Sequence, residues 1–226
     1  MAKIKEFVFN HFEENTYIVW DDSKQCAIID PGMNTAAENS KLAQFISDNG
    51  LRPVKVLLTH AHIDHIAGLR FACETYSLPI TAHADSMAFL KQAESYGSMM
   101  GFDTKNMDDI AFESIDESSA ITVGDTSIKT LYVPGHAAGS MAYVLESPNV
   151  VFTGDVLFRQ SIGRTDLPTG DYDVLMKMLN TKILMLDNDC EVLPGHGPNT
   201  TIGDEKNMNP FLLYPPTNNK LLNIKH

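Results

Sequence analysis

Thr59-His60-Ala61-His62-Ile63-Asp64-His65 is the stretch that decides how this chain is interpreted, because three imidazoles and a carboxylate follow one another at the end of an apolar run. Alternate side chains of an extended segment point the same way, so His60 and His62 can converge on one ion, with Asp64 next on that face. His65 points elsewhere, and this arrangement suits two neighbouring ions better than one. The stretch therefore predicts a metal site rather than unrelated surface or core histidines.

Three later positions supply further candidate ligands, each after a short apolar stretch and beside a glycine. They are His136 in Pro134-Gly135-His136, Asp155 in Thr153-Gly154-Asp155 and His196 in Pro194-Gly195-His196. A zinc-type ion takes about four N, O or S ligands, and a catalytic site leaves one position for water, so the first cluster cannot complete two sites alone. Glycine beside a strand-end ligand lets the backbone turn closely around an ion. These positions predict a site presented by loops.

The ordered series His-x-His-x-Asp-His, Gly-His, Gly-Asp and Gly-His resembles the metallo-β-lactamase superfamily of hydrolases, from about Ile4 to Leu212. The resemblance implies a four-layer αββα sandwich with the metals at one edge of two sheets, whereas the sequence pattern alone indicates only α/β or α+β. The ligands that it implies are, for a first ion, His60, His62 and His136; for a second ion, Asp64, His65 and His196; and, as a bridge, Asp155.

Further motifs narrow the resemblance to short glyoxalase II-like hydrolases. The motifs are Asn15-Thr16-Tyr17, Asp30-Pro31-Gly32, Gly163-Arg164-Thr165-Asp166-Leu167-Pro168, Leu193-Pro194-Gly195-His196-Gly197-Pro198 and Asn209-Pro210-Phe211. Such proteins keep the catalytic domain and lack the C-terminal helical region with which longer hydroxyacylglutathione hydrolases grip glutathione. We expect this chain to lack that region too, so weaker dependence on the peptide part of the thiol is expected.

Composition and charge exclude several classes of protein. The 226 residues are 43% hydrophobic, which suits one sizeable core and a single domain over 1–226. A formal net charge of −12 argues against nucleic-acid binding, because lysine and arginine supply most of that affinity. Neither a membrane span nor a secretory leader is expected, which predicts a cytoplasmic protein without a membrane partner. Cys26, Cys73 and Cys190 are expected to be buried, reduced thiols. The oligomeric state is left open.

The hydrophobic pattern predicts the elements around the site. The expected strands are Lys5–Phe9, Thr16–Trp20, Gln25–Ile29, Val54–Thr59, Pro79–Ala82, Ala120–Val123, Thr126–Val133, Met141–Leu145, Val150–Thr153 and Glu191–Leu193, and the expected helices are Thr35–Asp48, Ile66–Thr75, Ala84–Tyr96 and Asp173–Leu186. The amides that open the Ile66–Thr75 helix are expected to face the metal cluster. Met99, Met100 and Met107 are interpreted as a mobile surface loop in preference to a substrate entrance.

The remaining histidines are interpreted without a metal. His83, between a strand and a helix, is expected to cap or hydrogen-bond. His11, a turn residue, and His226, at the terminus, are excluded as ligands.

The predicted chemistry is hydrolysis with two divalent ions, zinc first and iron or manganese as alternatives. A divalent ion lowers the pKa of bound water to about 7, so a metal-bound hydroxide is available at neutral pH. Asp64 is the expected catalytic residue, which orients the nucleophile and accepts its proton. Arg164 is expected to hold a substrate carboxylate bidentately, or equally to pair with Asp166.

A small-molecule thioester is the expected substrate, because a thiolate leaves without a general acid and an amine does not. The resemblance implies hydroxyacyl thioesters such as S-lactoyl-glutathione. The alternative is a mononuclear iron persulfide dioxygenase, which resembles the chain in the loop at 163–166, whereas Gly195-His196-Gly197-Pro198 favours the hydrolase. His62 argues against a diiron oxygen reductase, and Asp155, where the best-studied β-lactamases carry cysteine, argues against antibiotic hydrolysis.

Overall fold

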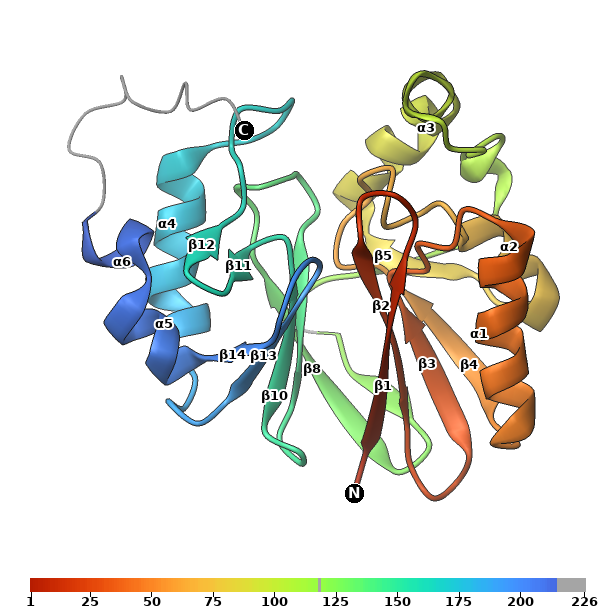
Figure 1. Ribbon diagram of the computed structural model, residues 1–226, viewed down its shortest axis with the longest axis horizontal. Coiled ribbons are helices and arrows are strands. Elements are labelled where there is room, and N and C mark those ends of the chain that lie inside the picture. Colours follow the sequence, from red (N-terminus) through yellow and green to blue (C-terminus); the bar gives the residue numbers. More distant parts are fainter. Residues whose placement is uncertain (118, 215–226) are drawn as a thin grey trace.

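The computed structural model describes residues 1–117 and 119–214, and each of these two halves forms a sheet with helices beside it (Figure 1). The first half contains β1 (Lys3–Phe9), β2 (Glu14–Trp20), β3 (Gln25–Ile29), α1 (Ala36–Asp48), β4 (Arg52–Leu57), α2 (Leu69–Tyr76), β5 (Ile80–His83), α3 (Met87–Met100) and β6 (Phe112–Ile115). The second contains β7 (Ile121–Val123), β8 (Thr126–Tyr132), β9 (Met141–Leu145), β10 (Val150–Gly154), β11 (Leu157–Phe158), β12 (Ser161–Ile162), α4 (Tyr172–Thr181), β13 (Glu191–Pro194), β14 (Thr200–Thr201), α5 (Ile202–Met208) and α6 (Pro210–Leu213). Short 3-10 helices lie at Ala84–Ser86, Met107–Asp109 and Ile183–Met185.

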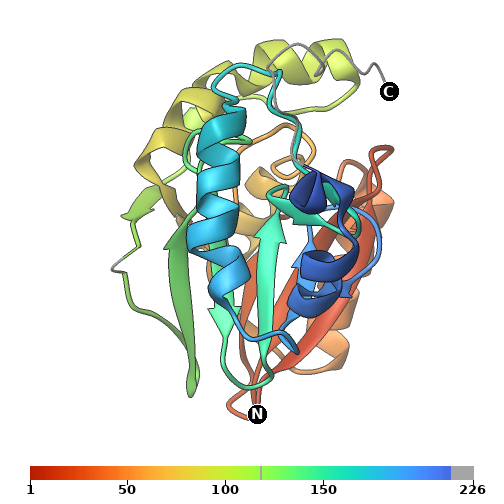
Figure 2. The same cartoon turned by 90° about the vertical axis from the view of Figure 1, so that its left-hand side faces the viewer.

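The two six-stranded sheets form the middle layers of the molecule. The first has the order β1-β2-β3-β4-β5-β6, antiparallel up to β3 and parallel from β3 onward. The second has the order β14-β13-β10-β9-β8-β7, and α4 makes the crossover between the parallel strands β10 and β13. Helices α1, α2 and α3 lie outside the first sheet, and α4, α5 and α6 outside the second (Figures 1 and 2). The expected four-layer αββα sandwich is confirmed.

Strand alternation builds a separate core between each pair of layers. In β2, Tyr17 and Val19 pack between the sheets, while Ile18 packs under the helices of the first half. In β10, Phe152 faces the other sheet and Val151 faces α4. A slip of one residue would exchange these faces, so the apolar pattern holds the register of both sheets. This rigid frame fixes the strand ends from which the candidate ligands project.

Two segments near the site differ from their expected structure. Helix α2 begins at Leu69, because the backbone between His65 and Gly68 turns instead, with His65 N–H donating to His62 O and Gly68 N–H donating to Pro31 O. The expected helix is thus present, but the expectation that it opens at the metal cluster is wrong, because it begins at Leu69 instead of Ile66.

Helix α3 runs on to Met100, so Met99 and Met100 are helical, and Met107 is buried in a 3-10 turn. Their interpretation as a mobile loop is also wrong.

Other local predictions hold with small changes at the ends. Thr35 is the N-cap of α1 and forms a capping box with Glu38, which explains where this helix begins. His83 accepts a hydrogen bond from Asp85 N–H and caps the following 3-10 turn, as expected. All three cysteines are buried and free. His226 lies outside the described residues. In residues 1–117 and 119–214, no helix combines the length and apolar character that membrane crossing requires.

Candidate metal centre

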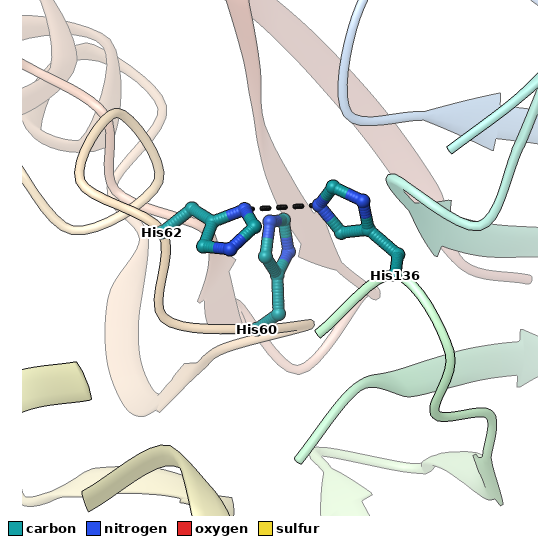
Figure 3. Close-up of side chains that lie close together, drawn as sticks. All are labelled: His60, His62 and His136. Carbon is teal, nitrogen blue, oxygen red and sulfur yellow. Dashed lines mark hydrogen bonds between the residues drawn. The ribbon is translucent and has the colours of Figure 1, made fainter. Parts of the chain in front are cut away.

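The first cluster consists of His60, His62 and His136 and combines loops from both halves of the chain. His60 and His62 follow β4 in the first half, and His136 follows β8 in the second. Their rings point at one another (Figure 3), with ligand atoms within 4.8 Å and His62 Nδ1 2.9 Å from His136 Nε2. His60 Nε2 is buried without a hydrogen-bond partner. A divalent ion would satisfy this orphaned nitrogen, so the cluster fits a metal.

The second cluster also combines both halves of the chain. Asp64, His65 and His196 bring their ligand atoms within 4.8 Å of one another. Asp64 Oδ2 lies 3.0 Å from His196 Nε2, and the Nε2 atoms of the two histidines lie 3.3 Å apart. Two imidazole nitrogens and a carboxylate that face one point form a donor set suited to a second divalent ion.

Asp155 lies between the clusters. Its Oδ1 is 3.3 Å from His65 Nε2, and its Oδ2 is 3.6 Å from both His136 Nε2 and His196 Nε2. Oδ1 is buried and accepts no hydrogen bond. The Asp155 carboxylate thus faces donor atoms of both clusters, as a bridging carboxylate must, and the whole arrangement suits a dinuclear metal site.

Asp30 is a supporting residue whose role the sequence did not reveal. Its buried carboxylate accepts hydrogen bonds from Thr59 N–H at 2.6 Å and Thr59 Oγ1 at 2.5 Å, and lies 3.0 Å from His65 Nδ1. These contacts leave His65 Nε2 as the nitrogen that faces the site. Asp30 therefore orients a candidate ligand, and it also forms, with His60 and His65, a third group whose possible ligand atoms lie within 4.8 Å of one another. The only sequence signal was an Asp-Pro-Gly motif after a strand.

Backbone carbonyls orient the two candidate ligands that loops of the second half contribute. His136 Nδ1 donates to Arg164 O at 2.8 Å, and His196 Nδ1 donates to Phe12 O at 3.0 Å. Both hydrogen bonds place the proton on Nδ1 and leave Nε2 free for a metal.

The β1–β2 hairpin holds the loop that carries His196. Asn15 Nδ2 donates to Pro194 O and to Gly197 O, and Tyr17 Oη donates to Pro194 O at 2.7 Å. Within this loop, a Cβ on Gly195 would lie 2.2 Å from Asp155 Oδ1, so only glycine fits. Residues of the Asn15-Thr16-Tyr17 motif thus hydrogen-bond to the loop that contains Pro194-Gly195-His196.

Glu14 is a second buried carboxyl group that sequence reasoning missed. It accepts a hydrogen bond from Thr16 Oγ1, and its Oε1 lies 3.9 Å from His65 Nδ1 without a hydrogen-bond partner. Burial raises the pKa of this carboxyl well above its ordinary value.

Electrostatics divide the histidines into two groups. Burial lowers the pKa of His60, of His136 and, to about 3, of His62, so these rings stay neutral and ready to bind a metal. Burial also lowers the pKa of His65, but the carboxylates of Asp155 and Asp64 outweigh it and raise the pKa well above its ordinary value. The carboxylates thus favour positive charge in the centre. Protons supply this charge in the metal-free chain, and divalent ions would supply it when bound.

A cavity of about 380 Å³ opens above the clusters and is lined by Asp64, Asp155 and the cluster histidines at 62, 136 and 196. Arg164 lies on its wall. The Arg164 guanidinium makes a bidentate pair with Asp166, with Nε to Oδ1 and Nη2 to Oδ2 both at 2.7 Å. The structure thus contains the pairing that was one of the two interpretations of Arg164. Its binding of a substrate carboxylate stays a prediction.

Comparisons with known proteins agree with this geometry. Residues 10–196 match the family model described as the metallo-beta-lactamase superfamily. A probable metallo-hydrolase, YqgX of Bacillus subtilis, is 37% identical over 200 residues, which cover 88% of this chain and 92% of the relative. Hydroxyacylglutathione hydrolase GloC of Haemophilus influenzae is 36% identical over 210 residues, with coverage of 89% and 93%.

Comparison with solved structures points to the same superfamily as the family model. BLEG-1, described as a B3 metallo-beta-lactamase, superposes with a TM-score of 0.84 at 34% identity and covers 93% of this chain and 99% of its own. TTHA1623 in a di-iron-bound form gives a TM-score of 0.81 at 32% identity, with coverage of 92% and 100%. Together with the family match over residues 10–196, these likenesses show that the chain belongs to the metallo-beta-lactamase superfamily.

Proposed function

We propose that this superfamily hydrolase is of glyoxalase II type and cleaves thioesters of small hydroxy acids, with S-lactoyl-glutathione as the first substrate to test. The observation that carries the proposal is the convergence of both clusters and Asp155 at the floor of one cavity. The relative named hydroxyacylglutathione hydrolase GloC supports the choice of substrate.

The bound ions would supply a nucleophilic water at neutral pH and polarise the thioester carbonyl. We propose zinc first, while the histidine and carboxylate donors also suit iron and manganese, and a similar structure is di-iron-bound. His60, His62 and His136 would hold one ion, Asp64, His65 and His196 the other, and Asp155 both.

The chain's own residues then have defined tasks. Asp64 lines the cavity as well as the second cluster, so its carboxylate is placed to orient the attacking water and to accept its proton. The Nδ1–H···O=C hydrogen bonds of His136 and His196 keep their rings in one tautomer during turnover. The thiolate that leaves needs no proton at the moment of bond cleavage.

The experiment is a metal analysis of the purified chain, joined to an assay against a thioester panel under air and under nitrogen. We expect up to two ions per chain and thioester cleavage that does not consume oxygen. Asp64→Asn should bind metal more weakly and lose most turnover. Oxygen-dependent sulfite production from a persulfide, with no thioester turnover, would instead support the mononuclear iron dioxygenase.

A second candidate, hydrolysis of β-lactams, is favoured by the likeness to BLEG-1. A chromogenic cephalosporin in the same panel separates the two activities. A kcat/KM for the cephalosporin above that for every thioester would reverse their order.

We propose further that the partner is a small molecule in the cytoplasm and not a nucleic acid, a view supported by the net charge of −12. Gel-shift assays at low salt would reveal nucleic-acid binding if this view is wrong.

A further inference from the structure

Exposed apolar side chains gather at the mouth of the cavity. Phe12, Tyr96 and Met100 line it, yet their exposed fractions are 42%, 44% and 46%. Large apolar groups gathered in one exposed patch of a folded chain mark a binding surface, whereas single exposed ones do not. Because all three surround the opening above the metal clusters, their position indicates that an apolar part of the substrate covers them.

Helix α3 supplies one wall of this mouth through a single stripe. Phe89, Ala93, Tyr96 and Met100 line the cavity and are spaced by four, three and four residues, so they lie on one face of the helix. Gln92 is the one polar side chain that α3 adds to this wall. Phe89 packs edge-on against His62, with ring centroids 5.4 Å apart. The stripe therefore extends from a candidate metal ligand out to solvent and leaves an apolar track for a substrate group.

Fixed positive charge is scarce on this surface. Among the described residues that line the cavity, Arg164 is the only arginine or lysine, and Asp166 offsets its charge through the bidentate pair. Glutathione carries carboxylates that would need such charges, and the net charge of −12 opposes an anionic ligand at long range. A glutathione moiety placed here would lose hydration of its carboxylates without gaining an unpaired cationic side chain as a partner.

From these observations we infer that the cavity binds the thiol half of the substrate as an uncharged, apolar group, and that the chain prefers such thioesters to those of glutathione. This inference rests on the proposed thioester hydrolysis, in which the small polar hydroxyacyl group lies at the metal clusters. The cavity of about 380 Å³ is at the lower end of small-molecule pockets and suits a compact aryl or alkyl thiol.

The test compares D-lactoyl thioesters of benzyl mercaptan, N-acetylcysteamine and glutathione with the metal-loaded full chain. We expect kcat/KM for the benzyl thioester to exceed that for the glutathione thioester by on the order of tenfold, since each buried methylene contributes a factor of about four. Calorimetry with the matching non-hydrolysable thioethers should show the same order of affinity.

Two methionines on α3 provide a matched pair of variants. Met100→Ala should lower kcat/KM for the benzyl thioester several-fold and lower that for the glutathione thioester much less, because Met100 lines the apolar part of the cavity. Met99→Ala removes the same side chain from the neighbouring position, which is 73% exposed and not part of the cavity wall, and should change neither. Tyr96→Ala should act like Met100→Ala. Equal metal content and circular dichroism show that the variants fold.

Each contrary result has a separate meaning. A preference for the glutathione thioester, or equal effects of the two methionine variants, overturns the inference and leaves thioester hydrolysis standing. Equal kcat/KM values for all three D-lactoyl thioesters overturn the assignment of the cavity to the thiol half. Absence of turnover with every thioester removes the proposed function, and the thioether affinities then decide whether the cavity selects apolar ligands.

Discussion

Replacing Asp30 by asparagine should weaken the second metal cluster while keeping the shape of the site. The carboxylate of Asp30 receives two hydrogen bonds from Thr59 and faces His65 Nδ1 at 3.0 Å. An asparagine that keeps its oxygen on the Thr59 amide presents its NH₂ group to His65. That ring must then accept through Nδ1 and carry its proton on Nε2, the atom that faces the cluster. Asp30 has φ of 49°, which asparagine also tolerates, so backbone strain is not introduced.

The magnitude follows from the lost tautomer and the lost charge. Loss of such a partner typically weakens metal binding about 10–100-fold, which corresponds to about 1.4–2.7 kcal/mol at the second site. Neutralising an acceptor of buried, charge-assisted hydrogen bonds also lowers the free energy of unfolding by about 2 kcal/mol. Asp21→Asn is the matched control, because Asp21 is likewise buried and accepts from Asp125 N–H and Thr126 Oγ1 far from the metal clusters.

The assay is a competitive chelator titration with elemental analysis, followed by chemical denaturation of the metal-free chains. Both variants should lose stability, but only Asp30→Asn should lose affinity at one of the two sites. If Asp30→Asn binds both ions as tightly as the parent chain, or if Asp21→Asn loses metal equally, the orienting role assigned to Asp30 is wrong.

Three further outcomes follow from the geometry. His196→Ala should reduce binding to one ion per chain, whereas Asp155→Ala should weaken both sites because its oxygens face both clusters; equal stoichiometries in the two variants would contradict the bridge. Gly195→Ala should lower the affinity for both ions at least tenfold, since its Cβ would lie 2.2 Å from Asp155 Oδ1, and elemental analysis checks this. Burial raises the pKa of Asp21, but its hydrogen bonds lower it to about 2 from 3.8. The ionised Asp21 should stabilise the metal-free fold above pH 4, and this contribution should disappear as the pH falls towards 2. Denaturation of the parent chain and of Asp21→Asn should therefore converge over that range.

The candidate ligands could be predicted because their signal is local. Each follows an apolar strand, and a strand end fixes where the next side chains project, so His60 and His136 meet once both sheets form. The order of the strands within each sheet cannot be predicted from such local signals. The αββα layering is implied by the family resemblance alone. Strand β6 was missed because Phe112-Glu113-Ser114-Ile115 is a half-exposed edge strand with little apolar periodicity.

The supporting residues could not be assigned roles, because their partners are distant in the chain. Asn15 and Pro194, which share a hydrogen bond, are separated by 179 positions. The start of helix α2 differs from the predicted start for a similar reason. The apolar pattern from Ile66 predicts helix, but the hydrogen bond from Gly68 N–H to Pro31 O holds the backbone before Leu69 in a turn. Local pattern predicts the candidate ligands, and tertiary contacts decide how these side chains are held.

Each cluster takes two ligands from the first half of the chain and one from the second, so a bound ion joins the two sheets at their shared edge. An ion that binds only the joined form stabilises it in proportion to the logarithm of its free concentration. When metal is scarce, the edge should open more often, and proteases cleave chains in proportion to the open population. Metal supply would then govern how long the protein persists in the cell as well as how fast it works.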